Sequence, residues 1–352
     1  MQIQRFSFLL FLSLFSCTSE KKELSLPEYS PHFIEWNDPK GFVKMLIPED
    51  NPLTEEGIAL GKRLFFDPIL SKEESISCAS CHNPALAFTD GQAKSIGFNR
   101  QLSERSSMSL FNVGYHHSGF FWDGRTKTLE EQALEPVENP LEMASDWNVV
   151  ENRLRKHEEY TALFAKAFNI QETAEITRQL AAKALAQYER TLLSADAKFD
   201  RVMRKEEAFT AAEQRGWAIF FDASEDLPDA ECAHCHIDPL FTTLEYLNNG
   251  LDRVETLEEF EDLGRGAVLK NKYYNGTFKV PSLRNIALTA PYMHDGRFET
   301  LEEVIEHYNS GGHYAVNVSP NVRKLNLNEQ NKKDLIAFLY TLTDYSLLKD
   351  KN

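Results

Sequence analysis

The sequence predicts a mainly α-helical protein of two related domains, and three observations lead to this prediction. The chain has 352 residues, which is enough for two domains of ordinary size. Apolar residues recur at helical spacing in several segments, whereas long alternating strand patterns are rare. Segments of the second half repeat segments of the first half in the same order. We therefore expect two copies of one helical domain, over residues 51–205 and 206–352.

Helices are expected where a capping residue precedes an apolar stripe. Thr54 and Thr300 are candidate N-caps, the first for a helix that follows it directly and the second for a helix over 301–308. Longer helices are expected over 173–193 and 328–342, where apolar side chains recur on one face. Packing of these faces against one another would give each domain its core.

Composition limits the classes of function. The chain has 38 Lys+Arg and 54 Asp+Glu, hence a formal net charge of −16. We expect no nucleic-acid partner, because binding phosphates requires a Lys- and Arg-rich surface. The acidic charge favours a basic partner, if charge guides an encounter at all. Hydrophobic residues make up 42% of the chain, which argues against wholesale disorder.

Residues 1–16 are expected to be a signal peptide. Arg5 precedes an apolar run over 6–15 that is too short to span a bilayer. Leu14-Phe15-Ser16-Cys17 resembles a bacterial lipobox, whose cysteine is lipidated and becomes the mature N-terminus. Plain secretion is the alternative. We expect residues 17–50 to be a lipid-anchored tether and N-terminal extension, and the protein to be periplasmic, with the lipid as its one link to a membrane.

The other four cysteines form two Cys-x-x-Cys-His motifs, Cys78-Ala-Ser-Cys81-His82 and Cys232-Ala-His-Cys235-His236. This is the attachment motif of haem c, in which both cysteines bind the porphyrin and the histidine binds the iron. A redox dithiol or a zinc site also uses paired cysteines, but neither explains a histidine directly after both pairs. The sequence therefore predicts two covalently bound haem c groups.

The internal repeat continues around both motifs. The segments 60–67 and 215–222 precede the first and second motifs, and both end in Phe-Phe-Asp. Asp123-Gly124-Arg125 and Asp295-Gly296-Arg297 follow them at an offset of 172 residues. The two haems are therefore expected in equivalent places of two domain copies.

Further motifs lie between and after these sites. They read Phe121-Trp-Asp-Gly-Arg125, Leu129-Glu-Glu-Gln-Ala133, Asn139-Pro-Leu-Glu-Met143 and Val280-Pro-Ser-Leu-Arg-Asn-Ile-Ala-Leu-Thr-Ala-Pro-Tyr-Met-His-Asp-Gly296. In order and content the chain resembles bacterial dihaem cytochrome c peroxidases and the related MauG enzymes, over nearly its whole mature length. The resemblance implies an N-terminal peroxidatic haem and a C-terminal electron-transfer haem, both near the domain interface. It also implies hydrogen peroxide as substrate and a soluble c-type cytochrome or cupredoxin as electron donor.

The resemblance assigns a role to five residues. His82 and His236 would be the proximal ligands of the two irons. Gln132 and Glu142 would be the distal pair, since an amide can orient bound peroxide and a carboxylate can relay its proton. Trp122 would lie between the haems on the electron path. Without the motifs, Gln132 and Glu142 would be read as surface residues and Trp122 as a core residue.

The chain departs from the classical members of the family at two positions. Where they carry a distal histidine, after the first haem motif, this chain has Phe98, so the first iron is expected to have an open position. Where they carry a methionine ligand to the second iron, this chain has Tyr308, as in MauG-type members. Met293 and His307 are the rival ligands.

Three functions therefore stay open: a peroxidase, a MauG-like enzyme that oxidises residues of a partner protein, and a non-catalytic dihaem electron carrier. The carrier would not need Gln132 and Glu142. The resemblance also allows a homodimer, and a calcium ion between the domains, although Ser106 replaces the usual asparagine ligand. Arg125 and Arg284 are expected to contact haem propionates or acidic side chains.

Overall fold

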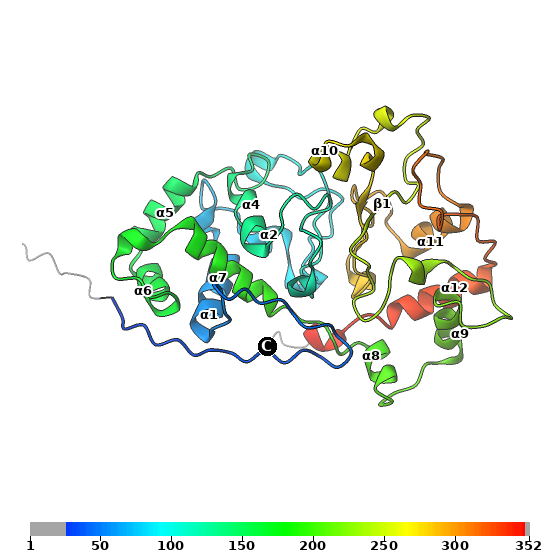
Figure 1. Cartoon of the computed structure of the whole chain (residues 1–352), viewed down its shortest axis with the longest axis horizontal. Helices are drawn as coiled ribbons and strands as arrows, with labels where there is room; N and C mark the ends of the chain where they lie inside the picture. Colours follow the sequence, from blue (N-terminus) through cyan, green and yellow to red (C-terminus); the bar gives the residue numbers. More distant parts are fainter. Residues whose placement is uncertain (1–25, 349–352) are drawn as a thin grey trace, which may run out of the picture.

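The computed structural model of the protein describes residues 26–348. The predicted signal peptide and the predicted lipidation site Cys17 lie outside the described residues. The described chain is mostly helical, with many short 3-10 turns and one two-stranded sheet (Figure 1), so the mainly α prediction is confirmed. Within residues 26–348, no helix has both the length and the apolar character needed to cross a membrane.

The first half of the molecule packs around a pair of helices, α1 and α7. Its helices are α1 (Glu55–Phe66), α2 (Cys78–Cys81), α3 (Leu129–Gln132), α4 (Glu135–Glu138), α5 (Trp147–Lys156), α6 (Glu158–Ala167) and α7 (Arg178–Arg190). A Cβ atom on Gly61 of α1 would overlap the Ala184 carbonyl of α7, so glycine allows these helices to approach closely. Leu60, Leu64 and Phe65 of α1 are fully buried in the core that results.

The second half packs around the pair α9 and α12. Its helices are α8 (Lys198–Met203), α9 (Ala211–Phe220), α10 (Arg265–Leu269), α11 (Leu301–Ser310) and α12 (Glu329–Tyr340). Gly216 of α9 meets the Asp334 carbonyl of α12, as Gly61 meets Ala184 in the first half. Strands β1 (Tyr246–Leu247) and β2 (Phe278–Lys279) pair antiparallel, with Tyr246 opposite Lys279. The domain limits of 51–205 and 206–352 stay a prediction.

The predicted helix starts are confirmed at three of four positions. Thr54 caps α1 by accepting a hydrogen bond from the Gly57 N–H, and Thr300 caps α11 by accepting one from Glu303. Asn328 caps α12 in the same manner. The prediction for 173–193 was wrong at its start, because residues 173–175 form a 3-10 turn and α7 begins after Thr177, whose hydroxyl accepts from the Leu180 N–H.

The two halves lie side by side, and the N-terminal extension runs along the first half to the place where the two halves meet (Figure 1). Met45 of this extension packs with Tyr115 of the first half and Leu240 of the second. Arg105 of the first half forms an ion pair with Asp262 of the second half (2.7 Å), and a further pair with Asp123 of its own half (2.6 Å). The extension and this arginine therefore hold the two halves in a defined orientation.

Candidate active site

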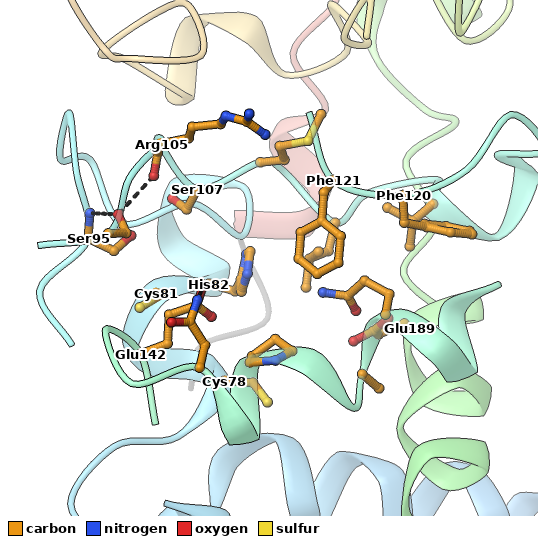
Figure 2. Close-up of a pocket in the computed structure, with 18 of the residues that line it drawn as sticks. Cys78, Cys81, His82, Ser95, Arg105, Ser107, Phe120, Phe121, Glu142 and Glu189 are labelled. Atoms are coloured by element: carbon orange, nitrogen blue, oxygen red, sulfur yellow. Dashed lines mark hydrogen bonds between the residues drawn. The ribbon is translucent and has the colours of Figure 1, made fainter. Parts of the chain in front are cut away.

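The first Cys-x-x-Cys-His motif forms part of the wall of a large pocket in the first half. Cys78, Cys81 and His82 line it from α2 and the residue that follows, and Figure 2 shows them around a cavity that Glu142 and Glu189 also face. The pocket has about 1490 Å³ of space not filled by atoms, open solvent at its mouth included. The second motif, Cys232 to His236, lines a separate pocket of about 1060 Å³ measured in the same way.

Each motif histidine is held with one ring nitrogen free. Nδ1 of His82 lies 2.9 Å from the Phe88 carbonyl, and Nδ1 of His236 lies 3.0 Å from the Phe241 carbonyl. A carbonyl accepts only, so Nδ1 carries the hydrogen in both rings and Nε2 keeps its lone pair. Burial lowers the pKa of His82, and lowers that of His236 to about 4. Both imidazoles are therefore neutral and prepared to bind a metal.

The backbone that presents these carbonyls is unusual in the same way at both sites. Phe88 has φ 59° and Phe241 has φ 54°, in the left-handed region that bulky residues rarely adopt. Each phenylalanine follows its histidine closely and accepts the histidine's hydrogen bond through its own carbonyl. The same local conformation thus orients the imidazole in both pockets.

The cysteines suit haem attachment better than zinc binding. Burial raises the pKa of Cys81 to about 11 and that of Cys232 to about 12, so both are protonated thiols at neutral pH. A four-cysteine zinc site would need the two pairs together, but Cys78 and Cys81 line one pocket while Cys232 and Cys235 line the other. Each pair stands beside a neutral imidazole at the wall of a large cavity. These residues fit one covalently bound haem in each pocket.

The predicted distal pair reaches the first pocket. Gln132, at the end of α3, and Glu142 both line it together with His82. The side-chain amide nitrogen of Asn139 donates a hydrogen bond of 2.7 Å to Oε1 of Glu142. The side-chain oxygen of the same residue, Oδ1, accepts a hydrogen bond from the Leu141 N–H. Burial is the largest influence on Glu142 and raises its pKa, so this carboxylate binds a proton more readily than a surface glutamate.

Phe98 takes no part in lining the first pocket. Its ring lies 5.0 Å from the Lys72 ammonium, and its N–H donates to the Glu142 carbonyl (2.8 Å). Among the described lining residues, His116 is the one histidine besides His82. Nε2 of His116 is buried and has no hydrogen-bond partner, and burial lowers the pKa of this ring to about 3.

The second pocket holds two of the three candidate sixth ligands. Tyr308 of α11 and Met293 line it, and the Asn249 amide donates to Oη of Tyr308 (3.4 Å) and to Sδ of Met293 (3.3 Å). His307 does not line the pocket, and its Nε2 lies 3.0 Å from the Asn249 carbonyl. Burial raises the pKa of Tyr308 to about 12. Its phenol therefore keeps its proton unless a metal displaces it.

Two residues line both pockets, Trp122 and Lys279. The Trp122 indole donates a hydrogen bond of 2.9 Å to the Ser106 carbonyl, and the Trp122 carbonyl accepts one of 2.8 Å from the Lys279 N–H. Trp122 and Lys279 therefore lie at the wall between the two pockets, and a role for Trp122 on an electron path stays a prediction.

Sequence reasoning missed Lys279, His116 and Glu189. Glu189 of α7 is buried in the first pocket, one of its carboxyl oxygens has no partner, and burial raises its pKa to about 8. Nothing in the local sequence marks these residues, because a lysine in a short strand or an acid in a helix is ordinarily at the surface. The arginines were better anticipated: Arg284 pairs with the buried Asp200 (2.8 Å), and Arg125 with Glu135 (2.6 Å).

Comparison with known proteins places these features in one family. Residues 55–208 match the family model described as di-haem cytochrome c peroxidase. The chain is 39% identical to the methylamine utilization protein MauG of Methylorubrum extorquens, over 84% of this chain and 80% of that protein. It is 35% identical to a cytochrome c551 peroxidase of Nitrosomonas europaea, over 87% and 84%. A crystal structure of a MauG-like protein associated with microbial copper homeostasis superposes with a TM-score of 0.81 at 35% identity, over 90% of this chain and 98% of that one.

Proposed function

The chain belongs to the family of di-haem cytochrome c peroxidases and MauG enzymes, and from this premise we propose that it reduces hydrogen peroxide to water. The electrons would come from an exported c-type cytochrome or a small copper protein. One observation carries the proposal: Gln132 and the buried carboxyl of Glu142 line the same pocket as Cys78, Cys81 and His82. An electron carrier would have no use for an amide and an acid there.

A haem bound through Cys78, Cys81 and His82 would supply the iron that takes up peroxide and electrons. Reduction of one peroxide to two waters consumes two electrons and two protons. Glu142 can take the proton from one peroxide oxygen and deliver it to the other, because burial raises its pKa and so makes it a better proton acceptor than a surface glutamate. The Gln132 amide can orient the peroxide by hydrogen bonding, and the Asn139 amide holds the Glu142 carboxyl in place.

A MauG-like reaction, the oxidation of residues on a partner protein, is the second candidate. Tyr308 favours it, because an anionic oxygen ligand would stabilise oxidised iron in the second pocket. Two curated relatives named MauG, at 39% and 37% identity, favour it too. We place the peroxidase first, since protein modification needs a dedicated partner.

The test is steady-state turnover of hydrogen peroxide by the holoprotein, with reduced cytochrome c or a reduced cupredoxin as donor. Donor oxidation should match peroxide consumption at two electrons per peroxide. Peroxide consumption without donor oxidation, or no consumption, would contradict the peroxidase. Oxidation of residues on a co-purifying protein under the same conditions would support the second candidate instead.

Location and assembly belong to the proposal as well. Export to the periplasm would suit covalent haem c, with Cys17 lipidated as the membrane anchor; mass spectrometry of the mature N-terminus tests this point. We also infer that the two halves are copies of one haem domain and that the haems lie near their interface. A calcium ion bound through Ser106 would have to replace the hydrogen bond that the Ser106 hydroxyl donates to the Met293 carbonyl (2.8 Å). Metal analysis of the purified protein would detect such an ion.

A further inference from the structure

Lys279 has an unusual position for a lysine. It lies on β2 opposite Tyr246 of β1, is 2% exposed, and lines both pockets. Its N–H binds the Trp122 carbonyl, and its ammonium donates to the Gly119 carbonyl and lies 5.5 Å from the centre of the Phe120 ring. The cation therefore stands at the wall that separates the two pockets, beside the tryptophan that both share.

The ammonium of Lys279 has no acidic partner of its own. Among the described residues no carboxylate lies within ion-pair distance of it, and the acid that most favours its charge, Asp123, is already paired with Arg105 (2.6 Å) and Arg125 (3.3 Å). Burial, with a smaller contribution from the nearby Arg265, lowers the pKa of Lys279 to about 7. A buried cation in this situation is costly unless an anion joins it.

The other lining cations are already paired with acids. In the first pocket, Arg105 pairs with Asp262 as well as Asp123, and Arg125 pairs with Glu135. In the second pocket, Lys279 is the one lysine or arginine among the described lining residues. Haem carries propionate carboxylates, and a haem in either pocket brings such anions into a largely apolar space.

We propose that the Lys279 ammonium is the counter-charge of a haem propionate at the wall shared by the two pockets. The inference rests on the proposed function only in that both pockets hold haem. A positive charge there favours the reduced state of the nearby iron, because reduction adds a negative charge to the site. Lys279 is thus a positioning residue that sets the relative potentials of the two haems on either side of Trp122.

Potentials of the purified holoprotein, measured by spectroelectrochemical titration without peroxide, test the proposal. Lys279→Met removes the charge, Lys279→Gln removes it but keeps a donor for the Gly119 carbonyl, and Lys279→Arg keeps the charge. Lys272→Met is the matched control, because Lys272 is exposed, pairs with Glu258 (3.0 Å) and lines neither pocket. Covalent haem content is measured for each variant.

The two neutral variants, Lys279→Met and Lys279→Gln, should lower the potential of one haem. We expect a tenfold change in the equilibrium constant for its one-electron reduction, which corresponds to about 59 mV. Lys279→Arg and Lys272→Met should leave both potentials near the wild-type values. The haem that shifts identifies which propionate binds the lysine. Unchanged potentials in fully loaded Lys279→Gln would overturn the proposal and leave Lys279 as a structural donor to Gly119.

Failure of a variant to load haem also decides the question. If the neutral variants bind little haem while Lys279→Arg loads fully, the charge is needed to receive the propionate, and the proposal stands. If Lys279→Arg fails alongside them, the site requires the shape of lysine rather than its charge, and the proposal falls. Because no peroxide is present, these outcomes are independent of whether the protein proves to be a peroxidase.

Discussion

The Asn139 amide donates a hydrogen bond of 2.7 Å to the carboxyl of Glu142. Asn139 is the C-cap of α4, and its side chain closes the turn that follows by also accepting a hydrogen bond from the Leu141 N–H. The turn therefore fixes where the Glu142 carboxyl lies in the first pocket. Burial raises the pKa of Glu142 whereas this hydrogen bond lowers it, so Asn139 adjusts the protonation of the group that would move the peroxide proton.

Replacing Glu142 by glutamine should slow peroxide reduction by about 10²–10⁴, the usual contribution of a positioned acid–base group. Glutamine keeps the shape and a hydrogen-bond partner for Asn139 but cannot carry the proton. Stopped-flow measurement of the reaction with peroxide gives the rate, and haem content should stay normal. Glu138→Gln, an exposed position on α4, is the control. Equal rates of peroxide reduction in Glu142→Gln and Glu138→Gln would mean that Glu142 takes no part in the proton transfer.

Replacing Asn139 by alanine should raise the pKa of Glu142, because the lost hydrogen bond stabilised the charged carboxylate. If the deprotonated carboxylate is the base, the acidic limb of the kcat/KM profile should move to higher pH by about one unit. At high pH the variant should approach the wild-type rate. A uniform loss of rate at every pH, with no shift of the limb, would mean that Asn139 acts on the shape of the turn alone.

The oxidised protein should contain one high-spin haem and react with peroxide without prior reduction. Phe98 stands where a distal histidine would be, its ring lies against Lys72, and it does not line the first pocket. Electron paramagnetic resonance of the resting protein counts the high-spin and low-spin haems. His116→Gln should leave the spectrum unchanged, which tests whether this other histidine of the pocket binds the iron. Two low-spin haems in the wild type would contradict the prediction.

Much of the candidate site could be predicted from sequence because it consists of residues that sit close together along the chain. Cys78, Cys81 and His82 come as one motif, and Asn139 and Glu142 come as another. The start of α7 could not be read in the same way, since Thr173 and Thr177 are both good caps and packing against α1 selects the second. Lys279 was missed because its burial depends on contacts with Gly119 and Trp122, far from it in sequence.

Tyr308→Met should raise the potential of the second haem, because a neutral thioether replaces an anionic oxygen that stabilises oxidised iron. Axial ligands move haem potentials over a wide range, so a shift on the order of 100 mV is expected.

In wild-type protein, burial raises the Tyr308 pKa to about 12, and only binding to iron would remove the phenol proton at neutral pH. The tyrosinate spectrum should therefore disappear in the variant. Tyr308→Phe is the matched control, and it leaves Met293, which shares the Asn249 amide with Tyr308, as the other candidate ligand lining that pocket. A peroxidase should keep donor-dependent turnover in Tyr308→Met, whereas a MauG-like enzyme should lose oxidation of its partner. If the spectrum and potential match the wild type, Tyr308 does not bind the iron, and Met293→Leu should then abolish the native spectrum.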